Sequence, residues 1–153
     1  MSPKPKISSK PSKIISETNI KDAPTELHIS YRYLCTNNKK YSLDLITDSR
    51  EKISLYNAMI NKLIEYSNID DFKKSFSDRS YKKHNHIHPI NWKDPQIKEQ
   101  CFTCLDANFM EQIKDDCWQL GIDNHKFRVH GFFIENVFYI VWLDPNHNLY
   151  YSK

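Results

Sequence analysis

The chain has 153 residues, of which 39% are hydrophobic and 13% aromatic, enough to build the core of one domain. The formal net charge is +3, and Gly121 and Gly131 are the only glycines. Neither a G-x-G-x-x-G fingerprint nor a P-loop can be written with them, which argues against dinucleotide- and nucleoside-triphosphate-binding folds. No apolar run approaches the roughly 20 residues that span a bilayer, and the N-terminus lacks a secretory signal. We therefore expect a cytoplasmic protein without a membrane partner.

Residues 1–25 are rich in serine, proline and lysine, and their prolines interrupt any helix. This composition predicts a disordered basic N-terminal arm, followed by a single domain over residues 26–153. Four cysteines occur, and without a signal peptide we expect them to be thiols rather than disulfides: Cys35, Cys101, Cys104 and Cys117.

The first half of the domain predicts one strand and one long helix. Alternating apolar residues indicate a strand over 27–35, and a turn follows at 37–40. Residues 41–45 form either a second short strand or a connector. Asp48 or Ser49 can cap a helix over 51–66, whose apolar residues fall at helical spacing and predict one apolar stripe: Leu55, Tyr56, Met59, Ile60, Leu63, Ile64 and Tyr66.

A shorter helix or turn is expected at 70–76, where apolar residues again recur at helical spacing. Residues 79–107 have no clean period and contain Pro89 and Pro95, which predicts an irregular insertion. Another short helix is indicated at 109–117.

Three successive strands are predicted over 117–122, 127–134 and 137–143, before a turn at Asp144-Pro145-Asn146. If Glu135 and Asn136 form a two-residue turn, Arg128 lies opposite Leu143, His130 opposite Val141 and Phe132 opposite Tyr139. Arg128, His130 and Tyr139 then share one face of the hairpin. The other face carries the apolar side chains Phe127, Val129, Phe133, Phe138, Ile140 and Trp142.

This order of elements predicts an α+β fold, a small antiparallel sheet ending in a β-meander and packed against one or two helices. The C-terminal hairpin, with Phe127-Arg128-Val129 on its first strand and a tail containing His147 and Tyr150, resembles the RelE/ParE-type toxins. These are small bacterial ribonucleases and gyrase poisons of toxin–antitoxin systems. Residues 128–147 together with His88-Pro89-Ile90-Asn91-Trp92 also resemble small bacterial proteins of unassigned function.

The first resemblance implies a metal-independent endoribonuclease that acts on mRNA, possibly at the ribosome, and is neutralised by an antitoxin protein. Such a reaction needs a base for the 2′-hydroxyl, a cation for the phosphorane and an acid for the leaving 5′-oxygen. Arg128 suits the phosphate, and His130 or His147 can act as acid or base. Tyr139 and Tyr150 complete the candidate catalytic set.

Basic residues around the insertion predict an RNA-binding surface, through Lys82, Lys83, His84, Arg79 and Lys126. No cofactor is required in this interpretation. The alternative is a non-catalytic module that binds nucleic acid or protein, stabilised by zinc if Cys101, Cys104, His86 and His88 form a tetrahedral site.

Overall fold

The computed structural model describes residues 25–150, so all but the last residue of the predicted basic arm lies outside the described residues. The fold is α+β, as predicted, with one five-stranded sheet in the order β1-β5-β4-β3-β2. The sheet is mixed rather than antiparallel, because β1 pairs in parallel with β5. Its strands are β1 (His28–Ser30), β2 (His88–Pro89), β3 (Cys117–Gly121), β4 (Arg128–Ile134) and β5 (Val137–Asp144).

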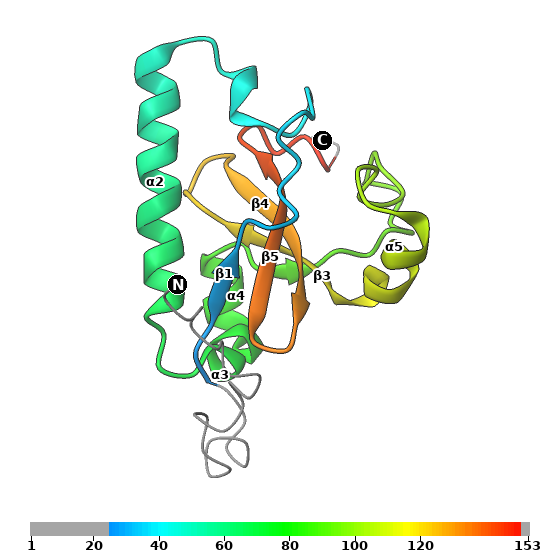
Figure 1. Ribbon diagram of the computed structural model, residues 1–153. Helices are drawn as coiled ribbons and strands as arrows, with labels where there is room; N and C mark the ends of the chain where they lie inside the picture. Colours follow the sequence, from blue (N-terminus) through cyan, green and yellow to red (C-terminus); the bar gives the residue numbers. More distant parts are fainter. Residues whose placement is uncertain (1–24, 151–153) are drawn as a thin grey trace, which may run out of the picture.

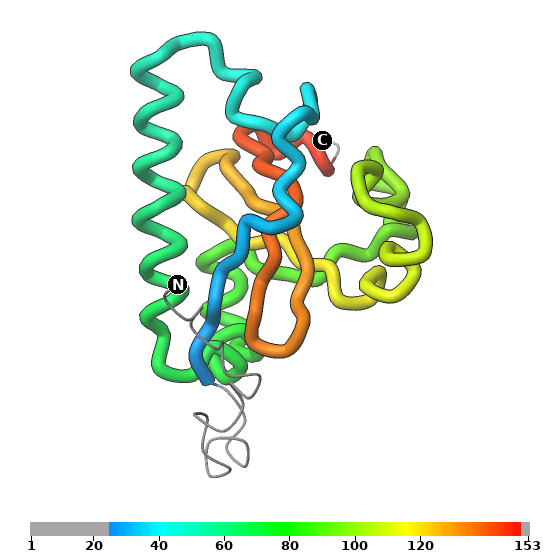
Figure 2. Tube along the Cα trace, in the orientation of Figure 1, coloured from blue at the N-terminus to red at the C-terminus, as the bar shows by residue number. Residues whose placement is uncertain are grey.

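The sheet separates two layers (Figure 1). One apolar cluster packs helices α2 (Ser49–Ser67) and α3 (Phe72–Ser77) against one face, with α4 (Arg79–His84) beside α3. A second cluster packs α5 (Ala107–Ile113) and the irregular segment 90–106 against the other face. Figure 2 shows that segment coiling beside α5, away from α2. No helix within residues 25–150 is long and apolar enough to cross a membrane.

Helix α2 begins two residues before the predicted position 51. One of the two predicted caps is confirmed, because the Asp48 carboxylate accepts a hydrogen bond from the Glu51 amide at 2.9 Å. The predicted apolar stripe is divided between two faces. Met59, Leu63 and Tyr66 are buried against the sheet. Leu55 is partly buried against the same cluster, whereas four other large apolar side chains of the helix are exposed: Ile53, Tyr56, Ile60 and Ile64.

The predicted first strand is too long. The chain leaves the sheet after Ser30, because Ser30 Oγ accepts the Arg32 amide and the Leu34 amide closes a turn onto the Tyr31 carbonyl. The turn at 37–40 is confirmed, since Asn38 Oδ1 accepts the amides of Lys40 and Tyr41. Residues 41–45 contain no strand and instead carry a short 3₁₀ helix, η2 (Leu43–Leu45).

The irregular insertion is shorter than the predicted 79–107. Asp78 ends α3 and caps α4, with its carboxylate accepting the Tyr81 amide at 2.9 Å. The chain then adds β2 to the edge of the sheet, through His88 and Pro89. A six-residue helix and a two-residue strand are too short to show a period, so this prediction is wrong for 79–89.

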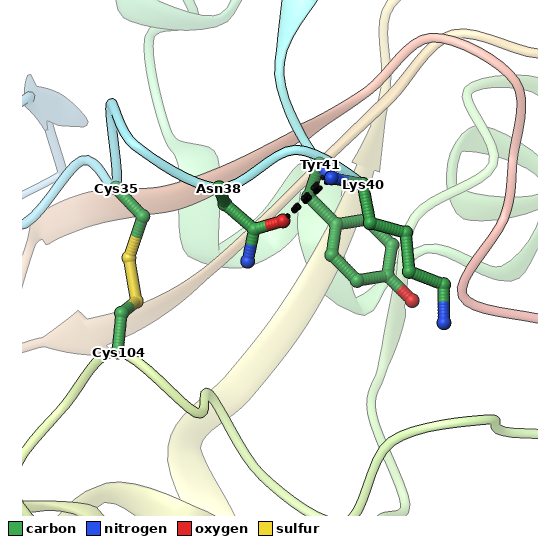
Figure 3. The surroundings of a disulfide bond; sticks show 5 residues. All are labelled: Cys35, Asn38, Lys40, Tyr41 and Cys104. Carbon is green, nitrogen blue, oxygen red and sulfur yellow. Dashed lines mark hydrogen bonds between the residues drawn. A yellow bond between two sulfur atoms is a disulfide. The ribbon is translucent and has the colours of Figure 1, made fainter. Parts of the chain in front are cut away.

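The prediction of free cysteines is wrong for two of the four. Cys35 and Cys104 form a disulfide across 69 residues, and it joins the segment after β1 to the irregular segment (Figure 3). Cys101 and Cys117 are free. A disulfide between positions so distant in the chain leaves no local sequence pattern.

The β4–β5 hairpin has the predicted two-residue turn and pairs Phe132 with Tyr139, but its register shifts beyond Gly131. His130 pairs with Trp142 instead of Val141, and Arg128 pairs with Asp144 instead of Leu143. Val141 is thus an extra residue in β5, which is a β-bulge. The bulge places Trp142 on the His130 face, contrary to the predicted alternation.

Gly131 is required at this bulge. A Cβ atom built on Gly131 would lie 2.1 Å from the Tyr139 carbonyl oxygen, which is far inside van der Waals contact. The neighbouring strand cannot retreat, because β5 is held on its other side by β1.

We expect Gly131→Ala to lower the free energy of unfolding by about 3 kcal/mol, since the strands must separate or lose the bulge. Urea denaturation measures this. Ile134→Ala is the control, because that side chain is 44% exposed on the same strand. Equal effects of the two changes would contradict the steric argument.

Candidate functional site

The shifted register assembles a polar site on the face of the sheet away from α2. His88, Gln119 and His130 lie side by side on β2, β3 and β4, with Trp142 next on β5. The neighbouring row contains Arg128 beside Asp144.

His130 and Asp144 form a fully buried pair. Their side chains are both 0% exposed, and His130 Nε2 lies 2.9 Å from Asp144 Oδ2. The Asp144 carboxylate also accepts the backbone amides of Asn148 at 2.6 Å and Leu149 at 3.0 Å. Burial alone would raise the pKa of Asp144, but these hydrogen bonds outweigh it and hold the pKa below its ordinary value. Asp144 therefore fastens the C-terminal loop to the sheet.

Arg128 is also buried, with 3% of its surface exposed. Its guanidinium donates to the backbone carbonyls of Asp123, His125 and Phe127, at 3.2, 3.1 and 2.9 Å. These bonds tie the β3–β4 loop to β4. The guanidinium contributes positive charge beneath the surface, and a substrate phosphate has no direct access to it in this conformation.

Above this buried layer, the C-terminal loop forms a pocket of about 440 Å³. The Tyr150 ring contacts both His147 and His88, with ring centroids 5.5 and 5.4 Å apart. His147 has a φ of 53°, a left-handed conformation that costs a residue with a Cβ about 1 kcal/mol or more. The pocket is lined by His88, Gln96, Lys98, Lys126, Asn146, His147, Asn148 and Tyr150.

Both pocket histidines favour the neutral form. Burial, with the nearby Arg128 charge, lowers the pKa of His147 to about 4. Burial also lowers the pKa of His88, against the opposing effect of its hydrogen bond to the Pro89 carbonyl. That contact joins His88 Nδ1 to the carbonyl oxygen at 2.9 Å, so Nδ1 carries the proton and Nε2 keeps a lone pair.

Six buried side-chain nitrogen or oxygen atoms have no hydrogen-bond partner within residues 25–150, and three of them lie at this site: Arg128 Nε and His130 Nδ1 beneath the pocket, and His147 Nε2 in its lining. Unpaired buried polar atoms are costly, and proteins retain few of them. Their concentration at one place supports a functional role for this cluster.

The predicted catalytic residues fall into three groups. His147 and Tyr150 line the pocket, and Lys126 joins them from the predicted RNA-binding set. Arg128 and His130 lie beneath it, closed to solvent. Tyr139 is elsewhere, stacked on Phe132 with ring centroids 5.1 Å apart.

The other predicted RNA-binding residues lie on α4, outside the pocket lining: Arg79, Lys82, Lys83 and His84. Sequence reasoning missed His88 as a pocket residue and Asp144 as the partner of His130. Both residues stand next to a proline in the sequence, in Asp144-Pro145 and His88-Pro89. The β-bulge brings Asp144 to His130, and the short strand β2 brings His88 to the same sheet.

The four residues of the alternative zinc site are not brought together. Cys104 is bonded to Cys35, and no group of three or more potential metal-ligating His, Cys, Asp or Glu side chains occurs within the described part of the chain.

A protein-family model described as "Uncharacterised protein UU032" matches residues 30–153, and the chain belongs to this family. Comparison with curated proteins and with solved structures gives no match.

We expect Asp144→Asn to lower the free energy of unfolding by about 3 kcal/mol, because it disrupts the hydrogen bonds of the carboxylate with His130 and with two loop amides at a fully buried position. Hydrogen exchange at the Asn148 and Leu149 amides should accelerate as the loop loses its anchor. Asp44→Asn is the control, since the Asp44 carboxylate is 78% exposed and its ion pair with Lys52 contributes little. Unchanged exchange at the two amides would contradict the anchoring role.

The depressed pKa of His147 predicts a loss of stability in acid. In the unfolded chain His147 has the ordinary histidine pKa of 6.5, whereas in the folded protein its pKa is about 4. The free energy of unfolding should therefore fall between these pH values, by about 1–2 kcal/mol after solvent screening. Urea melts of wild type and His147→Gln measure this, and identical pH slopes would contradict it.

Proposed function

We propose that the protein is an endoribonuclease that cleaves single-stranded RNA by attack of the 2′-hydroxyl on the adjacent phosphate, at the pocket between His88 and His147. The observation that carries this proposal is the pairing of two depressed-pKa imidazoles on either side of one tyrosine ring, with Lys126 and Lys98 at the same pocket. This reaction needs one neutral base, one protonated acid and a cation.

His88 suits the base. Its Nδ1 is engaged by the Pro89 carbonyl, so Nε2 can accept the proton of the 2′-hydroxyl. His147 in its protonated form would supply the proton to the leaving 5′-oxygen. Lys126 would balance the charge of the phosphorane, and the Tyr150 ring offers a surface on which a base can stack.

Arg128, His130 and Asp144 serve this proposal as a supporting layer. The buried pair holds the loop that carries His147, through the Asn148 and Leu149 amides. Arg128 adds a fixed positive charge, which opposes protonation of His147 in the free protein. A bound phosphate reverses this effect and favours the charged imidazole.

The resemblance to RelE/ParE-type toxins supports a more specific proposal, in which the RNA is mRNA at the ribosome and an antitoxin protein neutralises the enzyme. The chain departs from that pattern in having one long helix, α2, where those toxins have a pair. The second candidate function is a module that binds RNA without cutting it. The exposed basic side chains of α4 favour it, because they lie outside the pocket lining.

The test is cleavage of RNA by the purified full chain, with and without ribosomes and with a chelator present. We expect chelator-resistant cuts that leave 2′,3′-cyclic phosphate ends. His88→Gln and His147→Gln should each lower the rate by about 10²–10⁴-fold, whereas His28→Gln, an exposed histidine at the far edge of the sheet, should match wild type.

The pH profile distinguishes catalysis by these two histidines from cleavage by a contaminating ribonuclease. Since burial lowers the pKa of both imidazoles, kcat/KM should peak below pH 6.5, the ordinary value of histidine. It should fall on the alkaline side as the acid His147, with a pKa of about 4, loses its proton, and on the acid side as the base His88 gains one. Bound phosphate raises both pKa values, so the maximum of kcat should lie at higher pH. Intact RNA in every reaction of a folded protein would overturn the ribonuclease and favour the binding module.

A further inference from the structure

The Cys35–Cys104 disulfide lies at the protein surface. Cys104 is exposed and Cys35 is partly exposed, in contrast to the buried thiol of Cys117. A hollow of about 480 Å³ opens beside the bond, lined by residues 32–38 on one side and 103–105 on the other. Thiol–disulfide exchange needs access for an attacking thiolate, and exposed disulfides are the labile ones.

On the Cys35 side, the disulfide reaches the bulge of the sheet. The Cys35 amide donates to the carbonyl of Val141, the extra residue of β5, at 2.9 Å. The loop that follows carries Tyr41 (Figure 3), whose ring stacks on Trp142 with centroids 4.2 Å apart. Cys35 is therefore fixed to the same strand that ends in Asp144.

On the Cys104 side, the disulfide reaches the pocket. The irregular segment leading to Cys104 supplies Gln96 and Lys98 to the pocket lining. The Lys98 amide donates to the Leu149 carbonyl at 3.0 Å, and Ile97 forms a bridge with Tyr150.

Between these ends, one carboxylate joins the two loops. Glu99 accepts hydrogen bonds from Lys40 Nζ at 2.5 Å and from the Tyr41 hydroxyl at 3.1 Å. The disulfide is the covalent link between these two loops. Residues 96–104 contain no helix or strand of their own beyond the Ile97 bridge, so few backbone hydrogen bonds replace it.

We propose that the Cys35–Cys104 bond is an exchange site for a dithiol reductant, and that opening it loosens the pocket wall formed by residues 96–98. A thiolate of the dithiol attacks Cys104 Sγ, which forms a mixed disulfide and releases the Cys35 thiolate. The second thiolate of the dithiol then releases Cys104. The dithiol gives up two electrons and becomes a disulfide, while Cys35 and Cys104 become thiols. The effect on RNA cleavage rests on the proposed function, but the effect on the wall does not.

The experiment uses the full chain, oxidised and then treated with dithiothreitol, with thiols counted by alkylation and mass spectrometry. We expect two free thiols before reduction, Cys101 and Cys117, and four after it. Hydrogen exchange at the Lys98 amide should accelerate by about tenfold or more on reduction, while exchange at the Val129 amide in the core should not.

Two variants make the result specific. The double variant Cys35→Ser/Cys104→Ser should show the reduced exchange pattern without reductant and should not respond to dithiothreitol. Cys101→Ser is the matched control, because it removes a free thiol from the same segment and should behave as wild type. RNA cleavage should fall by about tenfold in reduced wild type and in the double variant.

Four free thiols in the oxidised protein, or unchanged exchange at Lys98 on reduction, would overturn the proposal. Equal acceleration at Lys98 and Val129 would also overturn it, since the bond would then be a global crosslink. Equal RNA cleavage in both redox states would overturn the regulation and leave the ribonuclease standing. A responsive wall without cleavage in either state would retain the exchange site and overturn the ribonuclease.

Discussion

One extra residue in β5 determines which polar side chains meet in this fold. Because Val141 bulges opposite Gly131, the strand beyond it is displaced by one position, and Asp144 pairs with Arg128 where regular alternation would place Leu143. The same displacement brings Trp142 to the His130 face, where Tyr41 stacks on it. The bulge requires glycine, since the Tyr139 carbonyl occupies the space of a side chain. A regular hairpin would place Leu143 opposite Arg128 and would dismantle the site.

The bulge makes the buried, hydrogen-bonded pair of His130 and Asp144 an anchor for the C-terminal loop. A fully buried pair gives little net stability, because the cost of desolvation offsets most of the attraction. The hydrogen bonds that Asp144 accepts from the Asn148 and Leu149 amides give the pair a structural role, because they fix the C-terminal loop to the sheet. They hold His147 in a left-handed conformation and keep Tyr150 between two histidines. The buried pair thus specifies the shape of the pocket.

Local patterns in the sequence predicted those elements that depend on interactions between residues close together in the chain. The capped helix α2, the two-residue hairpin turn and the three C-terminal strands all follow from spacing, capping and β-propensity over short windows. The bulge, the two-residue strand β2 and the disulfide depend on contacts between distant segments, and none has a local signature. The sequence therefore predicted His147, Tyr150 and Lys126 as site residues but named His88 only as a ligand of the alternative zinc site, because β2 brings His88 to the pocket from a distant segment. Arg128 and His130, which were also predicted to be catalytic, are buried beneath the residues that line the pocket.

The two walls of the pocket are held by different kinds of interaction. The His147 wall depends on the hydrogen bonds that the buried carboxylate of Asp144 accepts from the Asn148 and Leu149 amides. The wall that carries Lys98 depends on hydrogen bonds through Glu99 and on the covalent bond of Cys104. A reductant therefore acts first on the lysine wall. Because the Cys35 amide donates a hydrogen bond to the Val141 carbonyl, both walls are connected to the same bulge. A change at either wall can alter the pocket while the apolar layer under α2 stays packed, since that layer lies on the opposite face of the sheet.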